Sequence, residues 1–202
     1  HRLWKKELIN MINPQKGENL IDVASGSGDI AKLYNKRTKN KSKICCVDQN
    51  SNMVMIGKKR TQKYNNISWH ISSAEKLPFK DDTFDYYTIS FGIRNVIDID
   101  ETVREALRVL KVGGRFCCLE FSKVDNQFLN SFYKSYSRVI PYIGKLITGK
   151  SDPYKYLISS IEKFHDQQRL SEIVSNAGFE NVKYTNLSAG IAALHSGCLL
   201  YT

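Results

Sequence analysis

The stretch Ile21-Asp22-Val23-Ala24-Ser25-Gly26-Ser27-Gly28-Asp29 decides the fold, because an apolar, strand-like run leads there into a loop with two glycines that ends in a carboxylate. Glycines in such a loop allow the backbone to approach a ligand closely. A helix that follows the loop would offer free backbone amides to an anion. Asp29 occupies this entry, however, and no Lys or Arg lies between Ile21 and Ile30. The loop is therefore predicted to repel a pyrophosphate and to favour a ligand with a cationic end.

Outside this stretch, the hydrophobic pattern alternates between strand-like and helix-like segments. Strands are predicted at residues 20–24, 43–47, 67–72, 85–91, 115–120, 182–187 and 192–201. Helices are predicted at residues 2–12, 29–37, 51–64, 99–110 and 170–177. Asp29 is expected to cap the second helix. Strands separated by single helices imply an α/β fold with a doubly wound parallel sheet, whose ligands bind at the carboxyl ends of the strands.

The alternation breaks between residues 124 and 165. Apolar and aromatic residues recur there at helical spacing, interrupted by Pro141. We predict a helical insert that either covers the strand ends as an aromatic lid or packs against the sheet in an ordinary way.

The composition indicates one globular domain over residues 1–202, with 42% hydrophobic and 25% charged residues. The net charge of +10 fits attraction to nucleic acid or, more readily, to an anionic membrane surface. Lys is spread along the chain, however, so compositional bias is the simpler interpretation. Five cysteines without metal-ligand spacing favour a reducing compartment. Because the chain begins at His1 rather than Met, we expect it to be part of a longer one.

Asp48 lies at the end of the second predicted strand, about twenty residues beyond the glycine loop. A carboxylate at this place accepts both hydroxyls of a ribose, in dinucleotide enzymes and in methyltransferases alike. Residues 26–31 also satisfy the loose G-x-G-x-x-A pattern of nicotinamide enzymes, so a dinucleotide site remains an alternative. The acidic loop favours S-adenosylmethionine instead, because this cofactor carries a cationic sulfonium and no phosphate.

Further polar residues follow the other predicted strands. Ser73 and Ala74 come after the third strand, where Ser73 either contacts an adenine edge or is a simple polar cap. Ser90 ends the fourth strand. The predicted cofactor-binding residues are Ser25, Gly26, Ser27, Gly28, Asp29, Asp48, Ser73, Ala74 and Ser90. We expect no metal ion.

Phe91-Gly92-Ile93-Arg94-Asn95-Val96 follows the fourth strand directly. Such a turn at a carboxyl end is unusual for a purely structural loop. Arg94 would present a fixed cation to a substrate oxygen, and a surface ion pair is the alternative. No Ser/His/Asp set with recognised spacing is present, which disfavours covalent hydrolysis.

The chain resembles the ubiquinone/menaquinone biosynthesis C-methyltransferases, a class I S-adenosylmethionine-dependent family. The resemblance is carried by residues 1–5, 22–31, 75–79, 91–96, 108–114, 119–122, 156–157, 160–161 and 188–197. The most specific part is Phe-Gly-Ile-Arg-Asn at 91–95 followed by Leu-Glu-Phe-Ser at 119–122. Three positions depart from the family pattern, where Ser25 replaces Gly, Ser73 replaces Asp or Asn, and His165 replaces Pro.

This resemblance implies a Rossmann-like, mostly parallel seven-stranded sheet with helices on both faces. Residues 115–122 and 193–197 are more similar to the mitochondrial coenzyme Q enzymes than to the bacterial ones. The implied reaction is C-methylation of 2-methoxy-6-polyprenyl-1,4-benzoquinol at the matrix face of the inner mitochondrial membrane, with the bacterial cytoplasm as the alternative. The implied partners are other coenzyme Q biosynthesis proteins and the membrane surface, not nucleic acid. A homodimer remains open, and a segment upstream of His1 is expected to help close the site.

The mechanism that the family implies assigns catalysis to Arg94 and Asn95. The family role carried onto Arg94 is to start deprotonation of the quinol together with a water. Because an ordinary guanidinium is a poor base, we favour electrostatic stabilisation of the quinol oxyanion by Arg94. Asn95 would orient the ring. Three alternatives remain: a methyltransferase for another lipophilic acceptor such as a sterol or phenol, a non-catalytic scaffold of the quinone biosynthesis complex, and a nucleic-acid methyltransferase.

Overall fold

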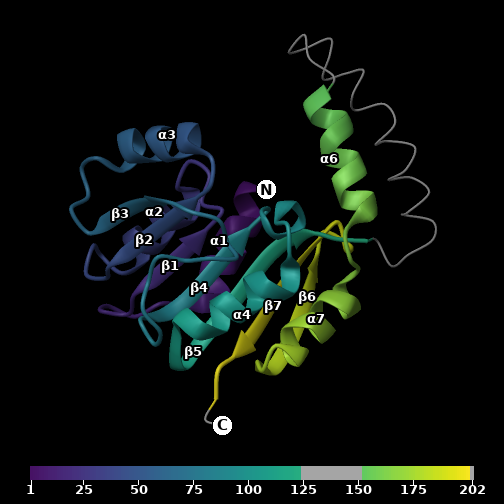
Figure 1. Cartoon of the computed structure of the whole chain (residues 1–202). Helices are drawn as coiled ribbons and strands as arrows, with labels where there is room; N and C mark the ends of the chain where they lie inside the picture. The colour runs from purple at the N-terminus through teal and green to yellow at the C-terminus, as the bar shows by residue number, and fades with distance from the viewer. Residues whose placement is uncertain (124–151, 201–202) are drawn as a thin grey trace.

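The computed structural model of the chain describes residues 1–123 and 152–200 (Figure 1). The described strands form one sheet of seven in the order β3-β2-β1-β4-β5-β7-β6. They are β1 (Leu20–Val23), β2 (Ile44–Asp48), β3 (Ile67–Ile71), β4 (Phe84–Ser90), β5 (Leu110–Phe121), β6 (Glu180–Leu187) and β7 (Ala192–Cys198). Among them only β7 runs antiparallel to both of its neighbours. The predicted mostly parallel sheet is confirmed.

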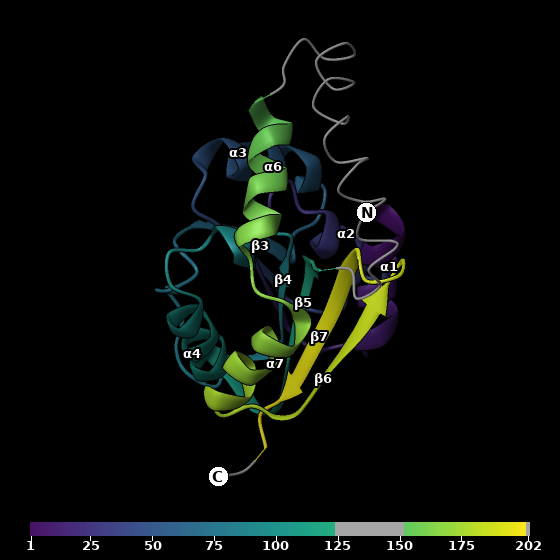
Figure 2. The ribbon, with the colours of Figure 1, turned by 90° about the vertical axis from the view of Figure 1, so that its right-hand side faces the viewer.

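Helices cover both faces of this sheet. They are α1 (Arg2–Ile12), α2 (Asp29–Arg37), α3 (Ser51–Thr61), α4 (Ile99–Val109), α6 (Asp152–Lys163) and α7 (Gln167–Asn176), with a 3₁₀ turn η1 (Ile93–Asn95). Figure 2 shows α1 and α2 on one side of the sheet and α4 and α7 on the other. Leu8 and Tyr34 are fully buried under the first pair, and Val103 and Phe116 under the second. Burial on both faces fixes the central strands and therefore the loops at their carboxyl ends.

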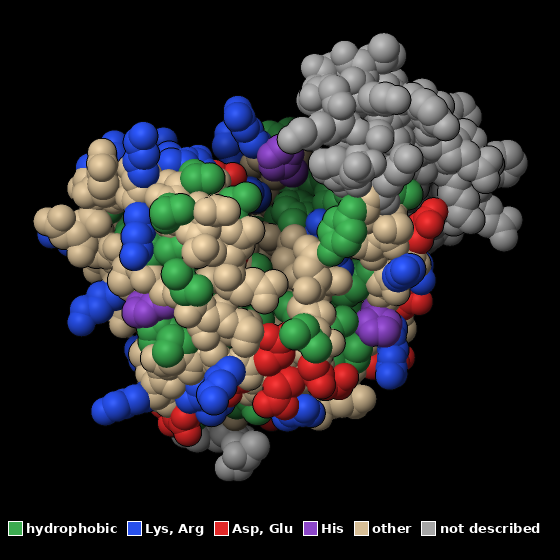
Figure 3. All heavy atoms as spheres, turned by 45° about the horizontal axis from the view of Figure 1, so that its top comes forward, with side chains coloured by type: hydrophobic (Ala, Val, Ile, Leu, Met, Phe, Trp, Pro, Cys, Tyr) green, Lys and Arg blue, Asp and Glu red, His purple; other side chains and the backbone are tan. Residues whose placement is uncertain are grey.

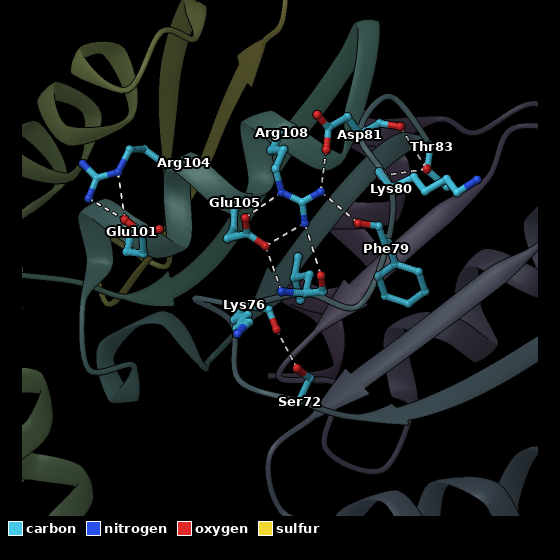
Figure 4. Close-up of polar contacts among 11 residues, drawn as sticks. Ser72, Lys76, Phe79, Lys80, Asp81, Thr83, Glu101, Arg104, Glu105 and Arg108 are labelled. Carbon is cyan, nitrogen blue, oxygen red and sulfur yellow. Dashed lines mark hydrogen bonds and ion pairs between the residues drawn. The ribbon is translucent and has the colours of Figure 1, made fainter.

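A loop, not a helix, connects β3 to β4, and Arg108 of α4 holds it in place (Figure 4). The Arg108 guanidinium donates to the backbone oxygens of Phe79 at 2.8 Å and Leu77 at 3.2 Å, and to the Asp81 carboxylate at 2.6 Å. Glu105 accepts a hydrogen bond from the Leu77 amide at 2.8 Å. These contacts give Leu77, Phe79 and Asp81 a structural role in this loop.

Several boundaries differ from the predictions. Among them, α3 ends at Thr61 and α7 begins at Gln167. β5 begins at Leu110 rather than at residue 115, because residues 111–114 form a bulged start of the strand in which Gly113 donates its amide to the Leu199 oxygen. Gly28, not Asp29, is the N-cap of α2, and no side chain caps that end. β7 ends at Cys198. Residues 124–151, most of the predicted insert, lie outside the described part of the chain. No described helix combines the length and the apolar character that crossing a membrane requires.

Candidate functional site

The carboxyl ends of β1, β2 and β4 lie at one edge of the sheet, where the loops that follow them enclose a cavity of about 320 Å³. Seven predicted site residues line it: Ser25, Gly26, Ser27, Asp48, Ala74, Ser90 and Asn95. The other four, Gly28, Asp29, Ser73 and Arg94, lie outside this lining. The structure therefore brings most of the predicted cofactor residues together and separates Arg94 from them.

The two glycines of the loop have different roles. Gly26 has a φ of +55°, and a Cβ added to it would meet no atom within 4 Å. Its missing side chain therefore leaves the floor of the cavity open. Gly28 has a φ of +80°, and a Cβ there would lie 2.9 Å from the ring of Trp69. Gly28 thus makes room for core packing under α2, whereas only Gly26 permits close approach of a ligand.

Asp48 joins the end of β2 to the glycine loop. One carboxylate oxygen accepts a hydrogen bond from the Gly26 amide at 2.8 Å, and the other accepts one from the Asn50 amide at 2.9 Å. Asn50 in turn caps the start of α3 through its side-chain oxygen. Since each carboxylate oxygen can accept more than one hydrogen bond, Asp48 keeps acceptor capacity for two ribose hydroxyls.

Asp29 is compensated by two cations that are distant in the sequence. Its carboxylate lies 2.9 Å from Lys5 Nζ and 2.8 Å from an Arg60 nitrogen. Arg60 also donates to the backbone oxygen and the hydroxyl of Ser27. Burial alone would raise the pKa of Asp29, but the hydrogen bonds and charges of Lys5 and Arg60 outweigh it and hold the pKa below its ordinary value. The prediction of a net acidic loop is therefore wrong.

Ser73, Ala74 and Ser90 differ in what they offer to a cofactor. Ala74 lines the cavity, whereas the Ser73 hydroxyl donates a hydrogen bond to the Glu75 carboxylate. The Ser90 hydroxyl is buried at the cavity and has no hydrogen-bond partner among the described residues. A buried polar group without a partner is costly. The orphaned Ser90 hydroxyl, the open floor at Gly26 and the acceptor Asp48 together fit an adenosyl cofactor.

Arg94 forms a buried ion pair. Its Nη1 atom lies 2.7 Å from a carboxylate oxygen of Glu120, and the two side chains are 8% and 1% exposed. Nη1 also donates to the Phe91 oxygen at 2.8 Å, and Nε donates to the Ser160 hydroxyl at 3.2 Å. Burial raises the pKa of Glu120 although the Arg94 charge opposes this shift. The predicted alternative of a surface ion pair is thus wrong, because this ion pair is buried. That Arg94 faces a substrate oxygen stays a prediction.

Helix α6 contacts both predicted catalytic residues. Tyr156 donates its hydroxyl to the Asn95 side-chain oxygen at 3.1 Å, and Ser160 accepts the bond from Arg94 Nε. Tyr156 and Ser160 are four residues apart and lie on the same face of the helix. A hollow of about 280 Å³ lies between α6 and the turn that carries Arg94. The described end of the predicted insert therefore borders the turn that carries Arg94 and Asn95.

Several cavity residues were not predicted from the sequence. Lys5 of α1 and Met53 of α3 line the cavity because their helices reach this edge of the sheet, and no local pattern indicates this. Asn50 also lines it. Its position two residues after Asp48, at a helix start, was a signal that could have identified it.

Comparison with known proteins assigns the chain to a family. The model of the ubiE/COQ5 methyltransferase family matches residues 1–199. The chain belongs to this family. Membership makes it a methyltransferase whose methyl donor is S-adenosylmethionine.

Named relatives and a solved structure agree with this assignment. The methyltransferase is 49% identical over 203 residues to the ubiquinone/menaquinone biosynthesis C-methyltransferase UbiE of Rickettsia bellii, covering 97% of this chain and 82% of the relative. It is 45% identical over 229 residues to the mitochondrial 2-methoxy-6-polyprenyl-1,4-benzoquinol methylase of Dictyostelium discoideum. This alignment covers 98% of this chain and 73% of the relative. A SAM-dependent methyltransferase from Aquifex aeolicus shares the fold, with a TM-score of 0.74 and 16% sequence identity. The superposition covers 98% of this chain and 93% of that structure.

Beneath the cavity of the methyltransferase lies Asp22, a carboxylate on β1 that is 1% exposed. One of its oxygens accepts a hydrogen bond from the Thr88 hydroxyl at 2.7 Å, and the other has no partner among the described residues. Burial raises the pKa of Asp22 to about 7, against the opposing hydrogen bonds of Thr88 and Ser25 and the charge of Lys5.

Asp22→Asn is expected to change how stability depends on pH. Between the ordinary pKa of 3.8 and the folded value of about 7, folded Asp22 binds a proton that the unfolded chain releases. The stability that this group contributes is thus full at low pH and is lost as the pH rises to about 7, by at most ~1.4 kcal/mol per pH unit. Asn cannot titrate, so the free energy of unfolding of the variant, measured in urea, should rise relative to wild type over this range. A difference that is constant with pH would contradict the assignment.

Proposed function

We propose that this methyltransferase transfers a methyl group from S-adenosylmethionine to a ring carbon of 2-methoxy-6-polyprenyl-1,4-benzoquinol. The observation that carries this proposal is the placement of Asn95 and Arg94. Asn95 lines the cofactor cavity, and the adjacent Arg94 is held rigidly behind it. Two relatives whose names include quinone biosynthesis or this benzoquinol support the choice of acceptor.

The cofactor supplies an electrophilic methyl group on a sulfonium. Asp48 accepts the ribose hydroxyls, and the buried Ser90 hydroxyl donates a hydrogen bond to the cofactor or accepts one from it. Asn95 presents its amide to the ring, with its oxygen already held by Tyr156. Arg94 Nη2 has no hydrogen-bond partner among the described residues. Its two N–H groups therefore remain for the oxyanion that pushes charge into the ring.

The proposed setting is the matrix face of the inner mitochondrial membrane, together with other coenzyme Q biosynthesis proteins. The relative from Dictyostelium discoideum is named as mitochondrial. The bacterial relatives are slightly more similar to this chain, so the bacterial cytoplasm remains the alternative setting. A homodimer is a further proposal, which size-exclusion chromatography with light scattering tests.

The function is tested by incubating the protein with S-adenosylmethionine and the reduced benzoquinol. Mass spectrometry should show a singly methylated product, and NMR should place the new methyl group on a ring carbon. Methylation of oxygen, or turnover of a sterol or simple phenol in preference to the quinol, would contradict the proposal. No turnover by the full-length protein would favour a scaffold.

Asp48→Ala is expected to weaken binding of S-adenosylmethionine by about ten- to a hundred-fold. The change removes the charged acceptor for the ribose and releases the Gly26 amide, and hydrogen bonds to charged groups contribute about 1.5–3 kcal/mol. Isothermal titration calorimetry measures the affinity. The matched control is Asp100→Ala, which removes an exposed carboxylate of α4 and should leave the affinity unchanged. Unaltered affinity in Asp48→Ala would exclude this residue from the site.

A further inference from the structure

A second, larger concavity adjoins the cofactor cavity. Its volume is about 800 Å³, and it is bounded by α1, α2 and the end of α3. Of the residues that the structure describes, eight Lys and Arg side chains and one acid, Asp29, line it. Lys5 lines both this basic basin and the cofactor cavity. In Figure 3, Lys and Arg side chains lie along the upper left edge and are also scattered over the left side of this face, whereas Asp and Glu side chains gather mainly lower down.

Most of the cations in the basic basin have no anion to balance them. Asp29 is already paired with Lys5 and Arg60. No other described residue forms an ion pair with the remaining basin cations. These are Arg2, Lys6, Lys32, Lys36, Lys39 and Lys63.

The spacing of these cations along α1 and α2 destabilises the two helices when no anion is bound. Arg2 and Lys6 on α1, and Lys32 and Lys36 on α2, are like charges four residues apart, which destabilise a helix. A surface that concentrates uncompensated cations in this way binds multiple negative charges. The basic basin therefore has the chemistry of a phosphate-binding surface.

Apolar side chains project from the same helices. Leu3 of α1 is 72% exposed, and Met55 and Ile56 of α3 are 61% and 47% exposed. Basic residues combined with protruding apolar side chains are typical of proteins that bind at the interface of a bilayer. A soluble phosphate ligand would not need the apolar side chains, and single-stranded nucleic acid would favour stacking aromatics, of which the basin offers only Tyr64.

We propose that the basic basin docks on the headgroups of anionic phospholipids and so places the mouth of the cofactor cavity at the membrane surface. This inference rests on the proposed function, since a polyprenyl quinol is dissolved in a bilayer and must reach the site from there. Lys5, which is shared by the two hollows, marks where the docked surface and the reaction site meet.

Vesicle sedimentation tests the docking. The protein is expected to bind vesicles of phosphatidylcholine mixed with phosphatidylglycerol, and to bind pure phosphatidylcholine vesicles far less. The triple variant Lys32→Gln, Lys36→Gln, Lys39→Gln should bind the anionic vesicles about 100-fold more weakly, from ~1 kcal/mol for each Lys near the surface. The control triple Lys76→Gln, Lys80→Gln, Lys183→Gln makes the same change in net charge at exposed positions outside the basin and should bind nearly as wild type.

Equal losses in the two triple variants would show that net charge alone drives binding and would overturn the proposal. It would also be overturned if the variant Lys32→Gln, Lys36→Gln, Lys39→Gln lost affinity for a DNA duplex and not for vesicles.

Turnover measurements separate this inference from the proposed function. With a short-chain, water-soluble benzoquinol and no vesicles, the basin triple should match wild type, because none of its three lysines lines the cofactor cavity. With the polyprenyl acceptor in anionic vesicles, its rate should fall in parallel with binding. If wild type methylates neither acceptor, the proposed function fails, and the vesicle-binding result still decides the docking.

Discussion

Arg94→Ala should lower turnover by about 100-fold or more while leaving the affinity for S-adenosylmethionine unchanged. Arg94 lies outside the cavity that fits the cofactor, so its removal should not affect cofactor binding. Its loss would take away the N–H donors that we propose for the developing oxyanion, and loss of one such donor costs about 10²–10³ in kcat. Steady-state kinetics with the benzoquinol measures turnover, and calorimetry measures cofactor affinity.

Arg94→Ala also leaves Glu120 buried without its partner, so a second variant is needed to separate catalysis from folding. Arg94→Lys keeps a positive charge beside Glu120 but lacks the planar fork that serves Phe91, Glu120 and Ser160 together. We expect this variant to keep a melting temperature near that of wild type and still to lose most of its turnover. Turnover at the wild-type level in a folded Arg94→Lys protein would show that the guanidinium has no catalytic role.

The sheet and its helices could be predicted from the sequence because their signals are local. β1 and the strands beside it are short apolar runs bounded by turn residues, and α1, with Leu8 and Ile12 on one face, begins and ends at the predicted residues. The start of β5 at residues 110–114 was missed, because Gly113 and Gly114 are typical of a turn. Pairing with Leu199, far along the chain, makes them part of a strand.

The charge of the site could not be predicted from the sequence around the loop. Asp29 has no basic neighbour in the sequence, yet Lys5 and Arg60, 24 and 31 residues away, both contact its carboxylate. The electrostatic argument against a pyrophosphate thus loses its basis. Similarity over residues 1–199 to a methyltransferase family supports S-adenosylmethionine instead, together with Asp48 and Ser90.

The charge partner of Arg94 could not be predicted from the sequence either. Arg94 follows β4, as predicted, but its partner Glu120 lies at the end of β5. Two strands that pair in parallel bring their ends together, so the fold itself predicts that these ends are close. The sequence alone does not show that the two side chains meet and neutralise each other.

Glu120→Ala should destabilise the folded protein by about 3–5 kcal/mol, because removing one partner of a buried ion pair leaves the other charge uncompensated. Glu120 is 1% exposed, and its carboxylate also accepts hydrogen bonds from the amides of Arg94 and Phe121. Urea denaturation followed by circular dichroism measures the loss. Glu101→Ala is the matched control, since it breaks an exposed ion pair with Arg104 and should cost no more than ~1 kcal/mol.

Glu120→Gln distinguishes a positioning role from a purely structural one. Gln keeps the shape and one acceptor oxygen for Arg94 but removes the charge, so its loss of stability should be smaller than that of Glu120→Ala. If Glu120 positions Arg94 for catalysis, kcat should fall in Glu120→Gln while the KM for S-adenosylmethionine stays constant. If kcat is unchanged in this folded variant, Glu120 serves stability alone, and Arg94 needs no carboxylate partner to act on the quinol.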